Sequence, residues 1–185
     1  IEAEQSGASY EFDEIISDVF KDIVADENLS DQVKALMLTI PDASTIANEF
    51  EADRDPVLIE RKLKALKTAL AKSCESDWFN LYQHKTKLSQ PYEYNKEEVG
   101  RRALANQALS YIREIDHPGA VVAVKTQYGA ANNFNDRIAA YKSIMQSDIS
   151  DAEFDFYVDD MAKRYAGNNN PLDNWASSTV YSKHM

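Results

Sequence analysis

The chain has 185 residues, which is enough for one folded domain with a substantial hydrophobic core. Its 31 acidic and 20 basic residues give a net charge of −11. This balance argues against nucleic acids and anionic membrane surfaces as partners, because clustered lysines and arginines are what bind them. The 5 glycines and 5 prolines are too few for a many-stranded barrel with tight turns.

The single cysteine, Cys74, rules out an internal disulfide, and its place on an apolar helical pattern predicts a buried, inert thiol. Low cysteine use fits a reducing compartment, so a cytoplasmic location is expected. No stretch approaches the ~18 consecutive apolar residues of a membrane span, and no signal peptide is recognisable. The first residue is Ile1 rather than methionine, which suggests a piece of a longer protein.

The first half of the chain carries the three- and four-residue apolar spacing of amphipathic helices. Residues 1–10 are expected to be a frayed lead-in to a helix that starts at Tyr10. The apolar positions expected to form its buried stripe are Phe12, Ile15, Ile16, Val19, Phe20, Ile23 and Val24. Next come a helix capped by Ser30, with a stripe of Val33, Leu36, Met37 and Ile40, and a short helix capped by Asp42 that contains Ile46, Ala47 and Phe50.

Asp55–Pro56 is a helix start, with a capping carboxylate followed by proline at the first helical position. The apolar spacing after it predicts one long helix that continues through Cys74 to Tyr82. A run of lysines lies on this helix: Lys62, Lys64, Lys67 and Lys72. Pairing with neighbouring acidic faces is the favoured interpretation of the run, and phosphate binding is the alternative. Residues 86–94 have the composition of a loop.

The most apolar and alanine-rich stretch is 100–141, and it is expected to form the centre of the fold. Asn95 and Glu98 have the spacing of a capping box at the start of its first helix. Small residues at Ala103, Ala105 and Ala108 would let a neighbouring helix come close.

Glu97 and Glu98 stand four residues before Arg101 and Arg102, which predicts structural ion pairs. The two arginines could instead bind the carboxylate at the far end of a peptide. The pairing interpretation is favoured, so neither arginine is assigned as a binding residue.

His117–Pro118–Gly119 turns the chain into a helix that is apolar nearly all round, so burial on every side is expected. Later starts are Asn133 or Asn135, a capping box at Ser150 with Glu153, and Pro171 as a first helical residue. The sequence therefore predicts an all-α fold of about nine helices, arranged as antiparallel pairs in a HEAT-like array. Residues 1–185 form one domain or part of one, with 182–185 frayed.

No reaction centre is recognisable in the sequence. The histidines His84, His117 and His184 lie far apart, without a ligand at zinc-binding spacing. No nucleophile elbow, phosphate loop or dinucleotide fingerprint is present. The sequence therefore assigns no catalytic, cofactor-binding or metal-binding residue to this chain.

The central stretch reads GRRALANQALSYI, followed by QYGAANNFNDRIAA. These two motifs resemble the C-terminal helical domain of bacterial aminopeptidase N, the zinc-dependent alanyl aminopeptidases. The residues that match are Arg101, Arg102, Ala103, Leu104 and Asn106, then Gln127, Tyr128, Ala131, Asn132, Asn133 and Asp136. Three weaker matches keep the family's order: LTIPDASTIANEF, DPVLIERKLKAL and LDNWASST.

The resemblance implies a non-catalytic domain that walls off the substrate chamber of an enzyme that removes N-terminal residues from peptides. The family's zinc and catalytic motifs are absent here, so zinc is expected in a missing catalytic domain of the same polypeptide. That domain and peptide substrates are the expected partners, and an array cut within the stack should expose Trp175, Thr179 and Val180 near its end. The alternative is a free-standing helical scaffold that binds protein partners. A helical enzyme unrelated to this family is a third possibility, which the lack of a catalytic constellation disfavours.

Overall fold

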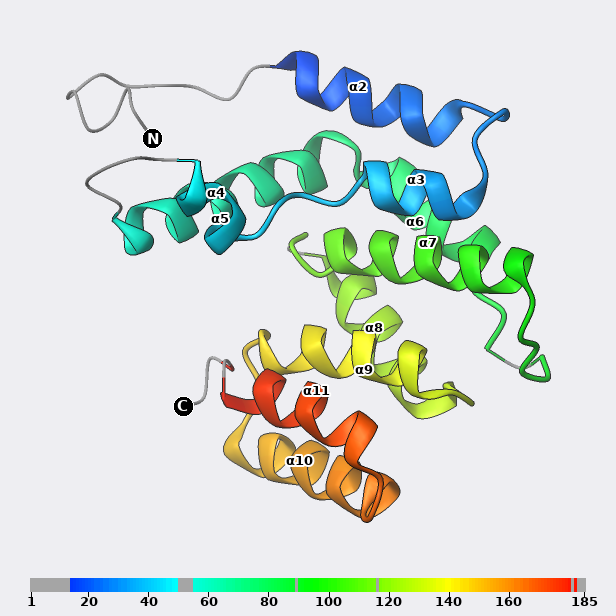
Figure 1. Cartoon of the computed structure of the whole chain (residues 1–185), viewed down its shortest axis with the longest axis vertical. Coiled ribbons are helices and arrows are strands. Elements are labelled where there is room, and N and C mark those ends of the chain that lie inside the picture. Colours follow the sequence, from blue (N-terminus) through cyan, green and yellow to red (C-terminus); the bar gives the residue numbers. More distant parts are fainter. Residues whose placement is uncertain (1–13, 50–54, 89, 116, 181, 183–185) are drawn as a thin grey trace.

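The computed structural model describes residues 14–49, 55–88, 90–115, 117–180 and 182, and in these ranges it is all-helical. Within the described ranges, ten helices follow one another and turn back repeatedly to build a stack (Figure 1). Their bounds are α2 (Glu14–Ala25), α3 (Asp31–Met37), α4 (Ala43–Asn48), α5 (Pro56–Ser73), α6 (Glu75–Lys85), α7 (Lys96–Ile112), α8 (Pro118–Ala130), α9 (Phe134–Met145), α10 (Asp151–Tyr165) and α11 (Asn169–Val180). The all-α helical array is confirmed. The expected helix start at Tyr10, the positions Phe12 and Phe50, and the ends 1–10 and 183–185 lie outside the described residues.

The prediction of one long helix from Pro56 to Tyr82 is wrong, because the chain bends at Cys74 between α5 and α6. Cys74 has φ −119° and ψ 29°, outside the helical region. The indole N–H of Trp78 donates to the carbonyl oxygen of Leu70 at 3.1 Å, which holds the two helices together across the bend. Leu70, Cys74 and Trp78 are buried on both sides of the bend. Their apolar spacing therefore runs through the bend without a break, so periodicity could not reveal it.

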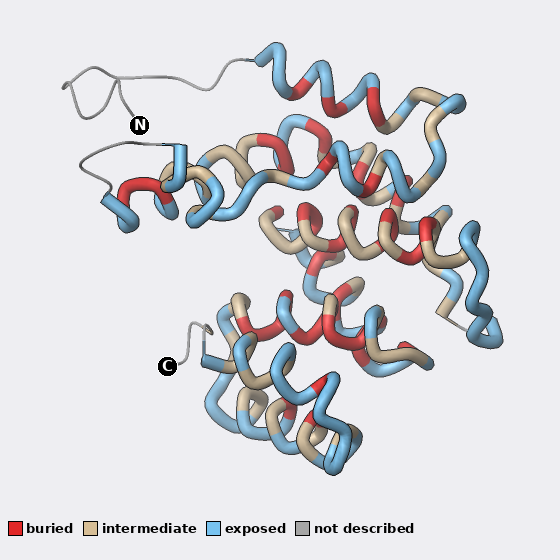
Figure 2. Tube along the Cα trace, viewed as in Figure 1, coloured by how far each residue is buried: buried red, intermediate tan, exposed pale blue. Residues whose placement is uncertain are grey.

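Helix α7 lies in the middle of the stack and contacts α3, α5, α6, α8 and α9. Its residues enter both hydrophobic clusters of the molecule. Leu104, Ala108, Tyr111 and Ile112 belong to the cluster built with α2, α3, α5 and α6, whereas Leu109 belongs to the one built with α8, α9 and α10. Buried residues are accordingly dense along α7 and α9 in Figure 2, and sparse on the helices at the two ends.

An aromatic group forms the centre of the first cluster. The rings of Trp78 and Tyr111 stack with centroids 4.3 Å apart and planes 9° from parallel. Phe20 meets both rings edge-on. The hydroxyl of Tyr111 donates to the carbonyl oxygen of Leu38 at 2.7 Å, so the polar end of this buried ring is satisfied.

The close approach of a neighbour to α7 occurs at Gly100. A β-carbon built there would lie 3.0 Å from the backbone nitrogen of Gln32, so α3 crosses α7 nearly backbone to backbone. Ala105 and Ala108 are buried on the same helix, and Ala103 is half-buried.

Most of the predicted helix starts are confirmed. The side chains that accept a backbone N–H as N-cap are Ser30, Asp42, Asp55, Asn95, Asn133 and Ser150. The capping box of Ser150 and Glu153 is complete. At Asn95 only half of the box forms, because the Glu98 carboxylate turns to Lys87 and Arg101 instead. The prediction of Pro171 as a first helical residue is wrong, because α11 begins two residues earlier, at Asn169.

Three predicted buried faces are wrong in whole or in part. On α2, Phe20 and Ile23 are buried as expected, but Ile15, Ile16 and Val19 of the predicted stripe are exposed. On α3, Ala35 and Leu38 face the core, and the expected stripe residues Val33, Leu36 and Met37 are exposed. Helix α3 crosses α7 near Gly100 with Ala35 and Leu38 turned inward, and its larger apolar residues lie on the other side. On α8, Val121 and Val122 are exposed, because only the face with Ala120, Val124, Gln127 and Tyr128 packs against neighbouring helices.

Near the end of the described chain, Val180 is exposed. Trp175 and Thr179 are half-buried. The expected apolar exposure at this end of the stack is therefore confirmed for Val180 alone.

Replacement of Trp78 by alanine is expected to lower the free energy of unfolding by about 3–5 kcal/mol, because it leaves a large cavity and removes the stack on Tyr111. Phe156→Ala on α10 is the control, since this ring is 60% exposed and its loss should cost about 0.5 kcal/mol or less. Urea denaturation of both variants measures the difference. Equal losses would contradict the central position of Trp78.

Candidate functional site

The residues that the sequence considered for chemistry do not come together. His84 is exposed and lies 2.6 Å from the carbonyl oxygen of Asn80, and the ring of His117 accepts the N–H of Gly119 at the start of α8. His184 lies outside the described residues. Cys74 is buried, as predicted, and burial raises the pKa of its thiol. Among the described residues, no group of three or more histidine, cysteine, aspartate or glutamate side chains is placed to hold a metal ion.

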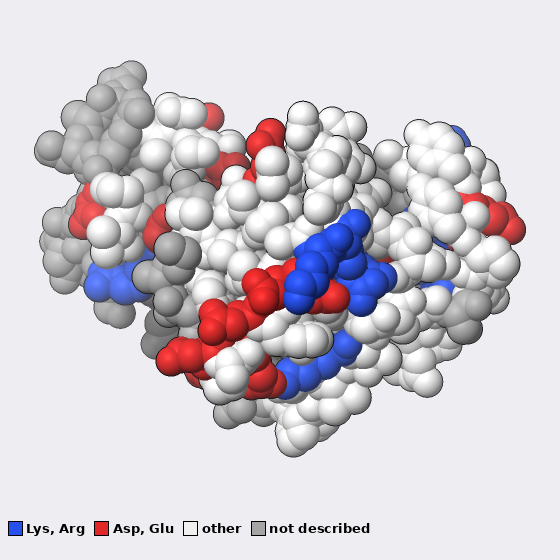
Figure 3. Space-filling model, turned by 90° about the horizontal axis from the view of Figure 1, so that it is seen from below, with Lys and Arg blue, Asp and Glu red and all other residues white. Residues whose placement is uncertain are grey.

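Charged side chains of both signs mix on the surface. Figure 3 looks onto the end of the stack where α10 lies, and basic side chains there stand beside a row of acidic ones. Two of the pairs at this end are Lys125 with Glu153 and Arg164 with Asp160, each at 2.6 Å. Within the described ranges, no helix is long and apolar enough to cross a membrane.

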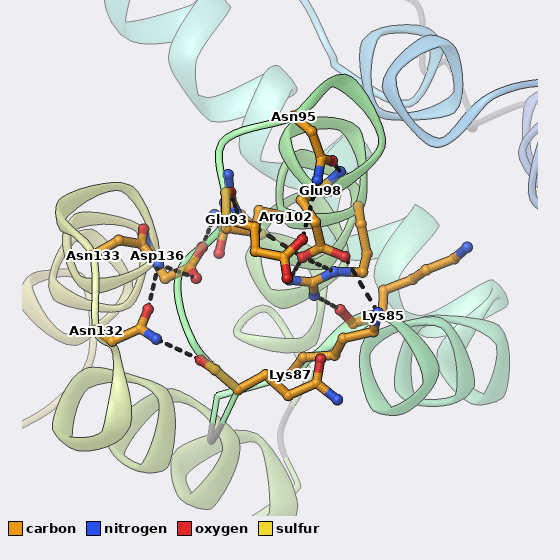
Figure 4. A network of polar contacts seen from close by, with 12 residues as sticks. Lys85, Lys87, Glu93, Asn95, Glu98, Arg102, Asn132, Asn133 and Asp136 are labelled. Atoms are coloured by element: carbon orange, nitrogen blue, oxygen red, sulfur yellow. Dashed lines mark hydrogen bonds and ion pairs between the residues drawn. The ribbon is translucent and has the colours of Figure 1, made fainter.

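Glu98 is the centre of a polar network that fixes the loop between α6 and α7 (Figure 4). It pairs with Arg101 at 2.7 Å, with Lys87 at 3.2 Å and with Arg102 at 3.8 Å. The hydrogen bond from Arg101 is the main reason why the pKa of Glu98 falls to about 2. The pair of Glu98 with Arg102 was predicted. Arg101 also pairs with Glu98, where the sequence had assigned it to Glu97.

Both arginines also hold the loop backbone. Arg102 is buried, donates to the carbonyl oxygen of Glu93 at 3.0 Å and lies 4.6 Å from the centroid of the Tyr92 ring. Arg101 donates to the carbonyl oxygen of Lys85. Their donors are therefore engaged within the chain, in agreement with a structural role.

The polar residues of the central motifs form a second network that joins α7, α8 and α9. The buried amide of Gln127 donates to the Asn106 side chain at 2.7 Å and to the carbonyl oxygen of Asp136 at 2.9 Å. Asn106 donates to the Asp136 carboxylate at 3.0 Å, and Asn133 caps α9 through the N–H of Asp136. Gln127 and Asn106 thus connect three helices through side-chain hydrogen bonds, and the network has a structural role.

An open groove on the concave side of the stack has a volume of about 1150 Å³. Its walls come from α5, from the C-terminal half of α7 and the first two turns of α8, and from the segments 39–41 and 146–148. The lining mixes apolar side chains, such as Leu63, Ile115 and Val121, with charged ones. Val121 of α8, which was expected in the core, therefore lies on the wall of this groove.

Lys67 stands at the groove with its side chain 29% exposed. Its ammonium lies 5.7 Å from the centroid of the Tyr111 ring and 3.8 Å from the Glu114 carboxylate. Burial, with help from the charge of nearby Arg113, lowers the pKa of Lys67 to about 8. Lys67 thus pairs with an acidic neighbour, as predicted for the basic run, yet the pairing does not offset the cost of burying its charge.

Arg113 and Glu114 complete this cluster. The Arg113 guanidinium forms an ion pair with the Glu114 carboxylate, which also faces Lys67. Two cations therefore share one carboxylate at the groove. Such an arrangement can bind a ligand, but it has no nucleophile with a base beside it and hence no evident covalent chemistry.

A stacked helical array with a lined concave groove defines a helical-repeat domain. A family model described as "Domain of unknown function (DUF3458_C) ARM repeats" matches residues 2–184, and the chain belongs to this family. Aminopeptidase N of Escherichia coli K12 is 25% identical over 134 residues, which are 72% of this chain and 15% of that protein.

Aminopeptidase A of Legionella pneumophila, solved in complex with aspartic acid, has the same fold with a TM-score of 0.79. The match covers 98% of this chain and 22% of that structure, at 18% sequence identity. The resemblance to the C-terminal helical domain of bacterial aminopeptidase N is therefore confirmed, and the chain fits a C-terminal domain of an aminopeptidase. It spans only a small part of these relatives.

The sequence did not point to the groove. Lys67 was noticed as one lysine of a run, and Arg113 and Glu114 were not singled out. The run gives no sign that Lys67 turns inward while Lys64 and Lys72 stay exposed. Helical phase relative to Leu66 and Leu70 could have placed Lys67 at the edge of the buried face, but not beside residues of α7.

Replacement of Glu98 by glutamine is expected to lower the free energy of unfolding at pH 7 by about 1–2 kcal/mol, because the carboxylate stabilises the fold only when ionised. Its folded pKa of about 2 lies below the usual 4.5, so this contribution is lost as the pH falls through that interval. Chemical denaturation between pH 7 and pH 2 should show the variant and the wild type converging. Glu97→Gln, one residue away and exposed, is the control; an equal effect there would contradict the network.

Replacement of Lys67 by methionine is expected to raise the free energy of unfolding at pH 7 by about 1–2 kcal/mol, because it removes a poorly compensated charge and keeps the volume. The folded pKa of about 8 lies below the usual 10.5, so the cost of the charge is full below pH 8 and fades toward pH 10.5. The advantage of the variant should shrink over that interval. Lys72→Met, on the exposed side of α5, should change little at any pH; a net loss of stability in Lys67→Met would contradict this account.

Proposed function

We propose that this chain is the non-catalytic C-terminal domain of a zinc-dependent aminopeptidase, and that it walls off the chamber in which peptides lose their N-terminal residues. The observation that carries the proposal is the groove on the concave side of a domain that matches a part of larger aminopeptidases. Zinc and the catalytic residues would be supplied by another domain of the same polypeptide.

The lining of the groove supports a role as a wall for peptides. It is open and built from several helices, so a peptide could lie along it without a lock-and-key fit. Its apolar side chains can contact peptide side chains of many kinds, which suits an enzyme that accepts varied sequences. The net charge of −11 fits peptide partners better than nucleic acids or membranes, and the cytoplasm is the proposed location.

The alternative function is a free-standing scaffold for protein partners. The exposed apolar residues Val33, Leu36 and Met37 on α3 are the feature that favours it, since such a surface suits contact with another protein. The same surface would equally suit contact with a neighbouring domain. A zinc-binding segment found upstream in the gene product would exclude the scaffold.

Closure of the groove by a bulky group tests the chamber role. In the full polypeptide, with its other accessible cysteines replaced, Val121→Cys is labelled with a polyethylene glycol maleimide; this residue lines the groove and is 53% exposed. Hydrolysis of a long unstructured peptide is expected to fall by about fivefold or more, while hydrolysis of alanyl anilide changes by less than about twofold.

Phe156→Cys on α10 is the matched control, because it is 60% exposed and lies outside the groove. Its label should leave both reactions unchanged. Equal effects of the two labels, or no effect of either on the long peptide, would contradict the chamber role. Stoichiometric zinc or turnover in the isolated chain would contradict its non-catalytic assignment.

A further inference from the structure

We infer that the cluster of Lys67 and Arg113 at the groove is a binding site for a carboxylate group of a peptide. The inference rests on the proposed function only for the identity of the ligand, since peptides are the molecules expected in the chamber. The site itself is argued from charge, position and lining.

The cluster holds more positive than negative charge at close range. Lys67 lies 3.8 Å from Glu114, and Arg113 is paired with the same carboxylate. A purely structural lysine would be stabilised by its surroundings, whereas Lys67 is made less basic by burial and by Arg113. Glu114 alone balances only one of the two positive charges of Lys67 and Arg113. A second carboxylate bound at this point would balance the other.

The Lys67 ammonium is held in place rather than free to swing into water. It lies over the ring of Tyr111, which is itself fixed by its stack on Trp78 and by its hydrogen bond to Leu38. A positioned cation loses less entropy when a ligand binds than a flexible surface lysine does. The aromatic core thus presents the cation to the groove.

The wider lining suits a carboxylate that belongs to a peptide. Besides Glu114, the acidic side chains at the groove are Glu60 and Asp148, and the other ionisable ones are Arg61, Lys64 and His117. The apolar residues Leu63, Ile115 and Val124 can contact the side chains next to that carboxylate, so a peptide fits better than a bare ion.

Three acetylated peptides test the site with the full 185-residue chain. Acetyl-Leu-Leu-Asp amide has a side-chain carboxylate, acetyl-Leu-Leu-Asn with a free C-terminus has a terminal one, and acetyl-Leu-Leu-Asn amide has neither. Calorimetric titration should show at least one carboxylate peptide binding about tenfold or more tightly than the neutral one. Whichever of the two binds more tightly identifies the source of the carboxylate.

The variants separate this site from non-specific attraction. Lys67→Met should weaken binding of the carboxylate peptide by about tenfold and leave the affinity for the neutral peptide unchanged. Lys67→Arg should keep most of the affinity for the carboxylate peptide. Lys72→Met, on the same helix but outside the groove, is the matched control and should bind like the wild type. At pH 8 the wild type should take up protons on binding, because the ligand raises the pKa of Lys67 from about 8, and Lys67→Met should not.

Equal affinity for charged and neutral peptides would overturn the inference, as would unchanged binding by a folded Lys67→Met chain. Displacement of the peptide by inorganic phosphate at matched concentration would also overturn it in favour of a general anion site. None of these outcomes affects the chamber role, which the labelled Val121→Cys protein tests through hydrolysis of long peptides.

Discussion

Helix α7 is buried along both of its sides, and the rest of the stack is positioned by that burial. One side carries Tyr111, whose ring stacks on Trp78 and whose hydroxyl reaches the backbone at Leu38. On the other side, Leu109 packs in the second cluster, and Asn106 joins the hydrogen-bond network of α8 and α9. The two hydrophobic clusters share this helix, and α8 also contributes to both, with Ala120 in the first cluster and Val124 in the second.

Helix α7 also contributes to the groove. The C-terminal half of α7 lines it together with α5 and the start of α8. Tyr111 therefore serves the core and the groove at once, since its ring stacks on Trp78 and also lies under the Lys67 ammonium. The packed aromatic core therefore holds the Lys67 ammonium in one position. A cation held in position loses less entropy on binding a ligand than a flexible surface lysine does.

Local rules predicted much of the fold. Cap residues such as Ser30, Asp55 and Ser150 fix helix starts through their own side chains, so the sequence alone sufficed for them. The faces of α3 and α8 could not be predicted in this way, because they depend on which side a distant helix approaches. Helix α3 packs on α7 near Gly100 with Leu36 pointing outward, and these two helices lie far apart in the sequence. The bend at Cys74 is a similar case, since both helices bury the same apolar spacing.

The polar residues follow the same division. The motifs around Arg101 and Asn133 were sufficient to identify the family, and their contacts are short-range pairs, caps and side-chain hydrogen bonds. Lys67 meets Arg113 and Glu114 only through the packing of α5 on α7, so no sequence motif could predict the cluster.

The central claim is that the concave groove faces the path of a peptide held by the catalytic domain. A peptide analogue bound in the active site of the full polypeptide, with a photoreactive group at its far end, tests this claim directly by cross-linking and mass spectrometry. Cross-links to α5, to the C-terminal half of α7 and to the start of α8 are the predicted result. Cross-links confined to α2 or α10, or absent from this domain, would contradict the account.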